Sequence, residues 1–238
     1  MKQYSKIIRT VLQSGFLIIL FLPKLFGQGT FQNLNFESAV IIPVPGDFYG
    51  RVQFSPALPG WTGTNGSSLE TLALFNNMFL DSTSLGIQGP GGTLGLPRIA
   101  GNYTAMIQSG YALSGPPTQA SASLSQTGLV PSGTASLQFL AAAYGPFQVA
   151  LNDIPINVTA VQSFANYTLY GVNIPAYAGT TTKLTFTAIP YATQPIISSL
   201  FLDSIQFSNQ LIPEPSILAI FGLGALLFSH RSRLARIS

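Results

Sequence analysis

Between residues 29 and 210 the chain repeats one pattern, in which apolar residues alternate with Ser, Thr, Gln and Asn over short runs that end at Gly or Pro. A period of two places the apolar side chains on one face of a β-strand. Many short strands joined by turns predict an all-β fold, an antiparallel β-sandwich or jelly roll, as one domain over residues 29–210. The predicted strands are residues 31–38, 50–55, 72–80, 101–108, 121–128, 136–142, 147–152, 167–173, 182–189 and 199–208.

The C-terminus contains an uncharged apolar run, residues 217–228, which is followed by Arg231, Arg233 and Arg236. As a helix this run would be about 18 Å long, which is short for a hydrocarbon core of about 30 Å. It would cross a bilayer only with local thinning or with arginines that reach the interface. Because the run is apolar on all sides, a short transmembrane helix is favoured over a buried core helix, and the arginines belong on the cytoplasmic side.

Pro213, Glu214 and Pro215 stand just before this run, and the prolines fix an extended entry to the helix. The triplet, the helix and the basic tail, in this order over residues 211–238, resemble the PEP-CTERM sorting signal of Gram-negative bacteria. The tail is less densely basic than is usual in that family. The resemblance implies a temporary anchor in the inner membrane and an exosortase, a transpeptidase-like membrane enzyme, that cuts near the triplet.

The N-terminus predicts a secretory signal peptide over residues 1–28. Lys2, Lys6 and Arg9 form a basic start, an apolar stretch follows, and small residues near Gly27 offer a cleavage site. An uncleaved anchor is the alternative. With the C-terminal signal, this predicts export, transient anchoring in the inner membrane, and a final place at the cell surface or in the extracellular matrix.

The basic character of the whole chain comes from these terminal segments. Residues 29–210 contain three basic and six acidic side chains, a net charge of −3, so we expect no binding to nucleic acid. The chain has no cysteine, so this domain must be stable without disulfides. The charged residues of the domain are Arg51, Arg98 and Lys183, and Glu37, Asp47, Glu70, Asp81, Asp153 and Asp203.

Enzymatic activity is not expected. The single histidine, His230, lies in the C-terminal tail, so the domain has no imidazole base and no Cys or His ligands for zinc. The six acids do not form a motif for hydrolysis by two carboxylates. The glycine-rich run at residues 86–101 lacks the Gly-Lys-Ser/Thr ending of a phosphate-binding loop and predicts a surface loop.

The domain also has a weaker resemblance to galactose-binding-like jelly rolls of carbohydrate-binding modules. It rests on the segments NLNFES, LPGWTG, IPAYAGTTTKLTF and LFLDSIQFS, in this order. In such folds an early and a late acidic residue help to hold a structural calcium ion, and the matching positions are Glu37 and Asp203. The alternative is that both carboxylates are solvated strand residues. No other cofactor is expected.

Trp61 is the residue most suited to binding a sugar, since a flat indole can stack on a pyranose ring. A lone tryptophan in a sandwich is more often a core residue, so the core role is favoured; Tyr49, Tyr103 and Tyr111 are weaker candidates for binding a sugar. Two functions follow. The first is a non-enzymatic structural or adhesive protein of the cell envelope or extracellular matrix, and the alternative is a carbohydrate-binding module for an extracellular polysaccharide.

Overall fold

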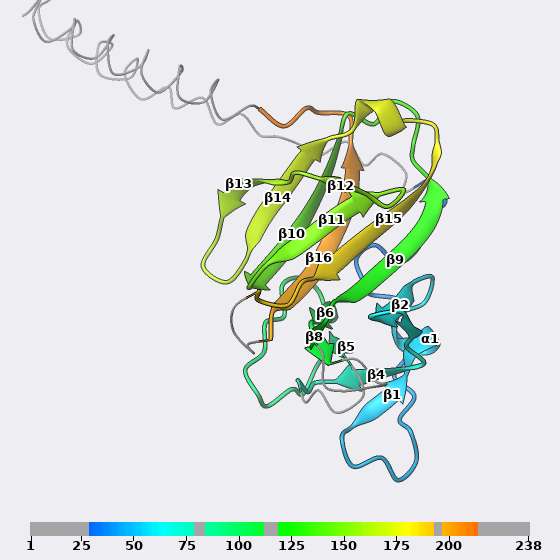
Figure 1. The fold of residues 1–238 in the computed structure, drawn as a ribbon, viewed down its shortest axis with the longest axis vertical. Helices are drawn as coiled ribbons and strands as arrows, with labels where there is room; N and C mark the ends of the chain where they lie inside the picture. Colours follow the sequence, from blue (N-terminus) through cyan, green and yellow to red (C-terminus); the bar gives the residue numbers. More distant parts are fainter. Residues whose placement is uncertain (1–28, 79–83, 112–118, 193–196, 214–238) are drawn as a thin grey trace, which may run out of the picture.

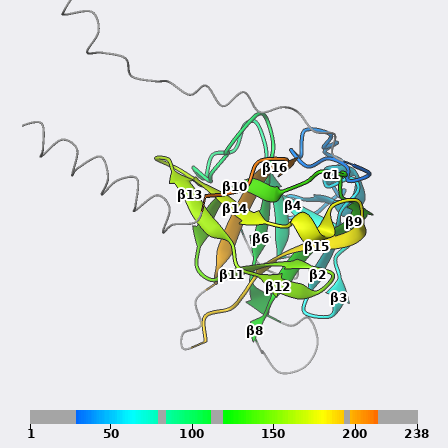
Figure 2. The ribbon, with the colours of Figure 1, turned by 90° about the horizontal axis from the view of Figure 1, so that it is seen from above.

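The computed structural model describes residues 29–78, 84–111, 119–192 and 197–213, and these residues form an all-β sandwich of two sheets (Figure 1). The view from above shows the two sheets as separate layers (Figure 2). None of the helices among these residues has the length and apolarity needed to cross a membrane. The predicted signal peptide and C-terminal helix lie outside the described residues.

The larger sheet has eight strands and the smaller has six. From edge to edge, the larger contains β1 (Arg51–Gln53), β4 (Leu72–Phe75), β5 (Leu85–Gln88), β6 (Thr104–Gln108), β16 (Ser199–Ser208), β10 (Ser136–Tyr144), β14 (Thr168–Asn173) and β13 (Thr159–Ser163). The smaller contains β12 (Ile154–Ile156), β11 (Phe147–Leu151), β15 (Thr181–Ala188), β9 (Ala122–Leu129), β2 (Thr62–Asn65) and β3 (Ser68–Leu69). A two-stranded ribbon, β7 (Gly110–Tyr111) with β8 (Gln119–Ala120), a short helix α1 (Phe54–Ala57) and a 3-10 turn η1 (Pro175–Tyr177) complete the described elements.

The longer strands follow the predicted pattern. In β15 the buried residues Leu184, Phe186 and Ala188 alternate with partly exposed Lys183 and threonines, as a period of two requires. The ladders are antiparallel with one exception among the described strands, because β4 and β5 pair in parallel. The all-β sandwich is therefore confirmed, and the prediction of a wholly antiparallel arrangement is wrong at this pair.

The first predicted strand, residues 31–38, is wrong. This segment forms turns in which Asn33 and Phe36 have positive φ angles of 50° and 60°, a left-handed backbone that interrupts a strand. Its apolar residues Phe31, Leu34 and Phe36 do not alternate regularly, yet all three are buried in the core. The carbonyl of Leu34 accepts a hydrogen bond of 2.9 Å from the Ile205 amide, which holds the segment beside β16.

A second, smaller apolar cluster lies on the outer face of the eight-stranded sheet. Leu74, Met106, Ala142 and Phe201 form its buried part, and Leu96 and Ile99 pack against them. The last two residues belong to the glycine-rich run, which begins inside β5 and continues as an irregular segment with a largely exposed tip. Beyond β5 the run is thus a surface loop, as predicted, and its apolar residues fasten it to the sheet.

Candidate functional site

An open groove is lined by residues of β11 and β12 from the smaller sheet and of β14 from the larger sheet. Figure 1 shows where these strands lie in the fold. The volume of the groove is about 340 Å³. Strand β11 contributes Phe147 and Gln148, β12 ends beside Asn157, and β14 contributes Tyr170. The groove lies at the edge of the smaller sheet that β12 forms, and none of the other described strands covers the space between β12 and β14.

Aromatic rings form the floor of this groove. Tyr170 stacks on Phe139 of β10 with ring centroids 5.5 Å apart and an angle of 17° between the planes. Phe147 meets Tyr170 edge to face at 5.3 Å. Tyr170 and Phe147 are partly buried and pack against the main core, so their positions are fixed while part of each ring faces the groove.

Two side-chain amides border these rings. Gln148 is half-buried and Asn157 is exposed, and neither side chain hydrogen-bonds to any other residue in the described part of the chain. Each amide offers two N–H donors and one carbonyl acceptor. Fixed aromatic surface beside unused amides is the combination that holds the apolar C–H faces and the hydroxyl groups of a sugar.

Trp61 lies in the core and not in this groove. Its side chain is 5% exposed, it stacks on Phe36 at 5.6 Å, and Phe186 lies at 6.4 Å. Its indole N–H donates to the carbonyl oxygen of Asn33 at 3.2 Å. The core role favoured for Trp61 is therefore what the structure has, and the sugar-stacking alternative is wrong for this residue.

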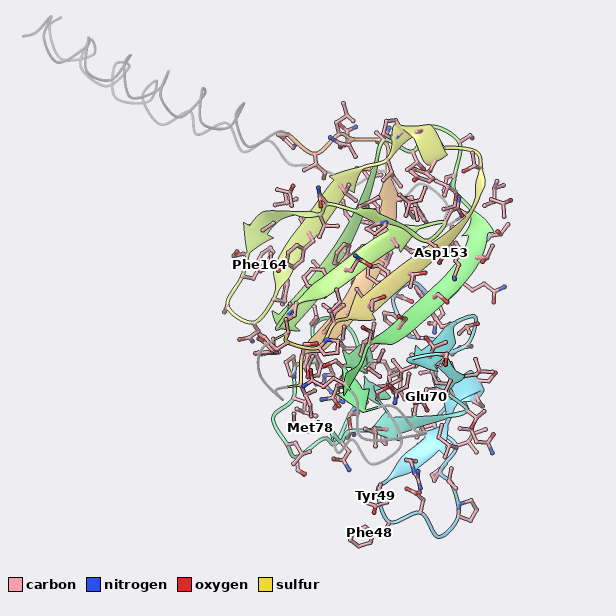
Figure 3. The ribbon with its side chains drawn as sticks, in the orientation of Figure 1. Phe48, Tyr49, Glu70, Met78, Asp153 and Phe164 are labelled. Carbon is pink, nitrogen blue, oxygen red and sulfur yellow. The ribbon has the colours of Figure 1, made fainter. Side chains whose placement is uncertain are left out.

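The tyrosines named as weaker candidates do not form a common site. Tyr49 lies in the loop before β1, with Phe48 beside it at the loop tip (Figure 3), and the Arg51 guanidinium sits 5.3 Å from its ring centroid. Tyr103 is partly buried against the core. The side chain of Tyr111 is outside the described residues. The groove residues Phe147, Gln148, Asn157 and Tyr170 were not predicted from the sequence.

Glu37 and Asp203 are brought to the same loop from opposite ends of the domain. Glu37 Oε1 accepts hydrogen bonds from the backbone amides of Asn102 and Tyr103 at 2.8 and 2.9 Å. Asp203 Oδ2 accepts from the Ala100 amide at 3.1 Å and from the Thr104 hydroxyl at 2.7 Å. The two carboxylates together fix the end of the glycine-rich loop.

The two carboxylates differ in burial. Asp203 is 1% exposed, so the solvated-strand alternative is wrong for it, and burial raises its pKa although Thr104 and the amides of Ala100 and Ser204 oppose the shift. Glu37 is half-buried in a turn. No group of three or more Asp, Glu, His or Cys that could hold a metal occurs among the described residues, and the calcium ion stays a prediction.

Two of the remaining acids, Asp47 and Glu70, both interact with Arg51. Asp47 is in an ion pair of 2.6 Å with Arg51, whose hydrogen bonds lower the pKa of the carboxyl. Glu70 is buried, and desolvation raises its pKa to about 7 against the opposing Ser84 amide and Arg51 charge. Neither side chain lines the groove.

Pro213 is exposed at the end of the described chain. The rest of the predicted sorting motif, Glu214 and Pro215, lies outside the described residues, as do Arg231, Arg233 and Arg236.

Comparison with known proteins gives matches among solved structures. The carbohydrate-binding module TmCBM61, solved in complex with β-1,4-galactotriose, matches 75% of this chain and 97% of its own with 13% identity and a TM-score of 0.40. The K2 cleaved adhesin domain of Lys-gingipain matches 73% of this chain and 96% of its own with 15% identity and a TM-score of 0.40. No family model and no curated protein matches this chain.

Proposed function

We propose that this protein is a non-enzymatic binding module for an extracellular polysaccharide, and that the groove between the sheets holds the sugar chain. The observation that carries the proposal is the pairing of a fixed aromatic floor, Tyr170 and Phe147, with the unused amides of Gln148 and Asn157. An open groove suits a polymer, because its sugar units can reach the aromatic rings from solvent. Such binding would serve a structural or adhesive role in a cell envelope or matrix.

Removal of both groove amides is expected to weaken polysaccharide binding about tenfold or more, because each hydrogen bond contributes roughly 0.5–1.5 kcal/mol. The test is isothermal titration of the Gln148→Ala/Asn157→Ala double variant with a panel of neutral galactans, glucans and xylans. Asn166→Ala is the matched control, since Asn166 is an exposed amide outside the groove. Equal affinity of the double variant and the control for every polymer that binds the wild type would refute the groove.

We also propose that the protein is exported and sorted through residues 211–238, on the strength of the PEP-CTERM resemblance and the signal-peptide pattern of residues 1–28. Intact-mass analysis of the protein from its native host is expected to show a chain without the residues after about Glu214. Replacement of Pro213, Glu214 and Pro215 by alanine is expected to leave the protein uncut in the inner membrane. A native mass that still includes Arg236 would contradict this proposal.

A further inference from the structure

A second hollow, separate from the groove, lies beside the glycine-rich loop. Its volume is about 250 Å³, and the polar side chains that line it are Asn76, Gln88 and Arg98. Glycines of the loop and two leucines, Leu94 and Leu96, line the rest. None of the described acidic residues is part of this lining. We call this hollow the Arg98 pocket.

The walls of the Arg98 pocket are held by hydrogen bonds. Asn76 Oδ1 accepts from the Gly89 amide at 2.7 Å, and Asn76 Nδ2 donates to the Pro90 carbonyl at 3.0 Å. Gly92 comes so close that a Cβ there would lie 3.2 Å from the Asn76 side chain, so a larger residue would crowd this wall. The other end of the loop is fixed by the Glu37 and Asp203 carboxylates described above. The pocket therefore needs little ordering when a ligand binds.

Arg98 is the one basic residue of the described chain that lacks an acidic partner. Arg51 pairs with Asp47 at 2.6 Å and Lys183 with Asp153 at 2.8 Å, whereas the exposed guanidinium of Arg98 has neither an ion pair nor a hydrogen bond within the described residues. The two acids beside the end of this loop, Glu37 and Asp203, already accept hydrogen bonds from Tyr103 and Thr104. The planar guanidinium is thus available to bind a carboxylate or sulfate through two parallel hydrogen bonds.

Gln88 supplies a second donor. Its side chain is almost fully buried, and its Nε2 lies 3.5 Å from both the Asn77 carbonyl oxygen and the Met106 sulfur. The contact to oxygen is at the outer limit for a hydrogen bond, and the thioether sulfur is a weak acceptor, so the amide N–H groups are poorly used within the described part of the protein. A ligand oxygen in the pocket would give this amide a better partner.

From these contacts we infer that the Arg98 pocket binds an anionic group, a carboxylate or a sulfate, on an acidic glycan. Arg98 supplies the charge and the paired donors, and Gln88 supplies the neutral donor. The domain as a whole carries a net charge of −3, so recognition depends on this one cation and not on a general positive field. The site is independent of the groove and adds selection for acidic polymers to the proposed binding of polysaccharide.

The test compares three polymers with the purified full-length protein in mild detergent: polygalacturonate, a sulfated galactan and a neutral galactan. Wild type is expected to bind at least one acidic polymer about tenfold or more tightly than the neutral one, since hydrogen bonds to charged groups are the stronger ones. This preference is expected to shrink as salt is raised. Comparison of the two acidic polymers distinguishes a carboxylate from a sulfate as the preferred group.

The Arg98→Gln variant is expected to lose the preference for acidic polymers, and Arg98→Lys is expected to keep only part of it, because lysine has the charge without the planar fork. The Gln148→Ala/Asn157→Ala variant changes the groove and is expected to keep the preference. If Arg98→Gln binds the acidic polymers as tightly as wild type does, the Arg98 pocket is not their site, and binding of the neutral galactan still reports on the groove. Equal wild-type affinity for all three polymers would also overturn the inference.

Discussion

Replacement of Trp61 by alanine is expected to lower the free energy of unfolding by about 3–5 kcal/mol. The indole is 5% exposed and lies between Phe36 and Phe186, so its removal loses buried apolar area and leaves a cavity between the sheets. It also leaves the Asn33 carbonyl without the indole N–H, in a turn where Asn33 already has a positive φ. Denaturant unfolding followed by fluorescence or circular dichroism measures the loss.

Phe48→Ala is the matched control for this variant. Phe48 is also a large aromatic residue, but it is 94% exposed at the tip of its loop (Figure 3), so its removal is expected to change stability by no more than about 0.5 kcal/mol. A loss below about 1 kcal/mol for Trp61→Ala would mean that the indole does not pack in the core.

The strands that could be predicted from the sequence are those in which local pattern and final environment agree. Residues 199–208 are predicted as a strand and form β16, because one of their faces packs on the core while the other carries Asp203 and Phe201, which belongs to the smaller apolar cluster. Residues 31–38 contain as many apolar side chains but bury them through turns. Nothing in a single sequence marks Asn33 and Phe36 as positions of left-handed backbone, so the segment cannot be told from a strand.

The candidate site was harder to predict than the strands, because it depends on which strands become neighbours. Gln148 and Tyr170 lie in segments that were correctly predicted as strands, yet they line one groove only because β11 and β14 belong to different sheets that face each other. Residue spacing along the chain carries no information on this contact. Glu37 and Asp203 are the opposite case, because the resemblance to galactose-binding-like jelly rolls singled out both residues. In the structure, Glu37 accepts a hydrogen bond from the Asn102 amide and Asp203 accepts one from the Ala100 amide, both at the end of the glycine-rich loop.

Glu70 is expected to make the stability of the protein fall as the pH rises. The side chain is 7% exposed and burial raises its pKa to about 7 from an ordinary value of 4.5 (Figure 3). Its Oε1 atom has no hydrogen-bond partner within the described part of the structure. The folded state therefore binds the proton more tightly than the unfolded state does.

The sign and the pH window follow from these two pKa values. Below about pH 4.5 the carboxyl is protonated in both states and its stabilising contribution is complete; as the pH rises through 7, the folded state must hold a buried carboxylate and the contribution is lost. The difference between the folded and the unfolded pKa of Glu70 corresponds to a change of at most about 3 kcal/mol in the free energy of unfolding. Burial also raises the pKa of Asp203, so Asp203 changes the stability in the same direction as Glu70. Arg51 lowers the pKa of Asp47, so Asp47 changes the stability in the opposite direction at low pH.

The Glu70→Gln variant separates the effect of Glu70 from the other acids, because glutamine keeps the size of the side chain but cannot ionise. We expect the free energy of unfolding of wild type, measured in urea with a chelator present, to decrease between pH 5 and pH 8, and we expect the variant to lose most of that decrease. Asp153→Asn is the control, since its side chain is 72% exposed and its change should leave the slope intact. If Glu70→Gln and wild type share one slope, water or a cation reaches the carboxylate in the folded state and Glu70 is not desolvated as its burial implies.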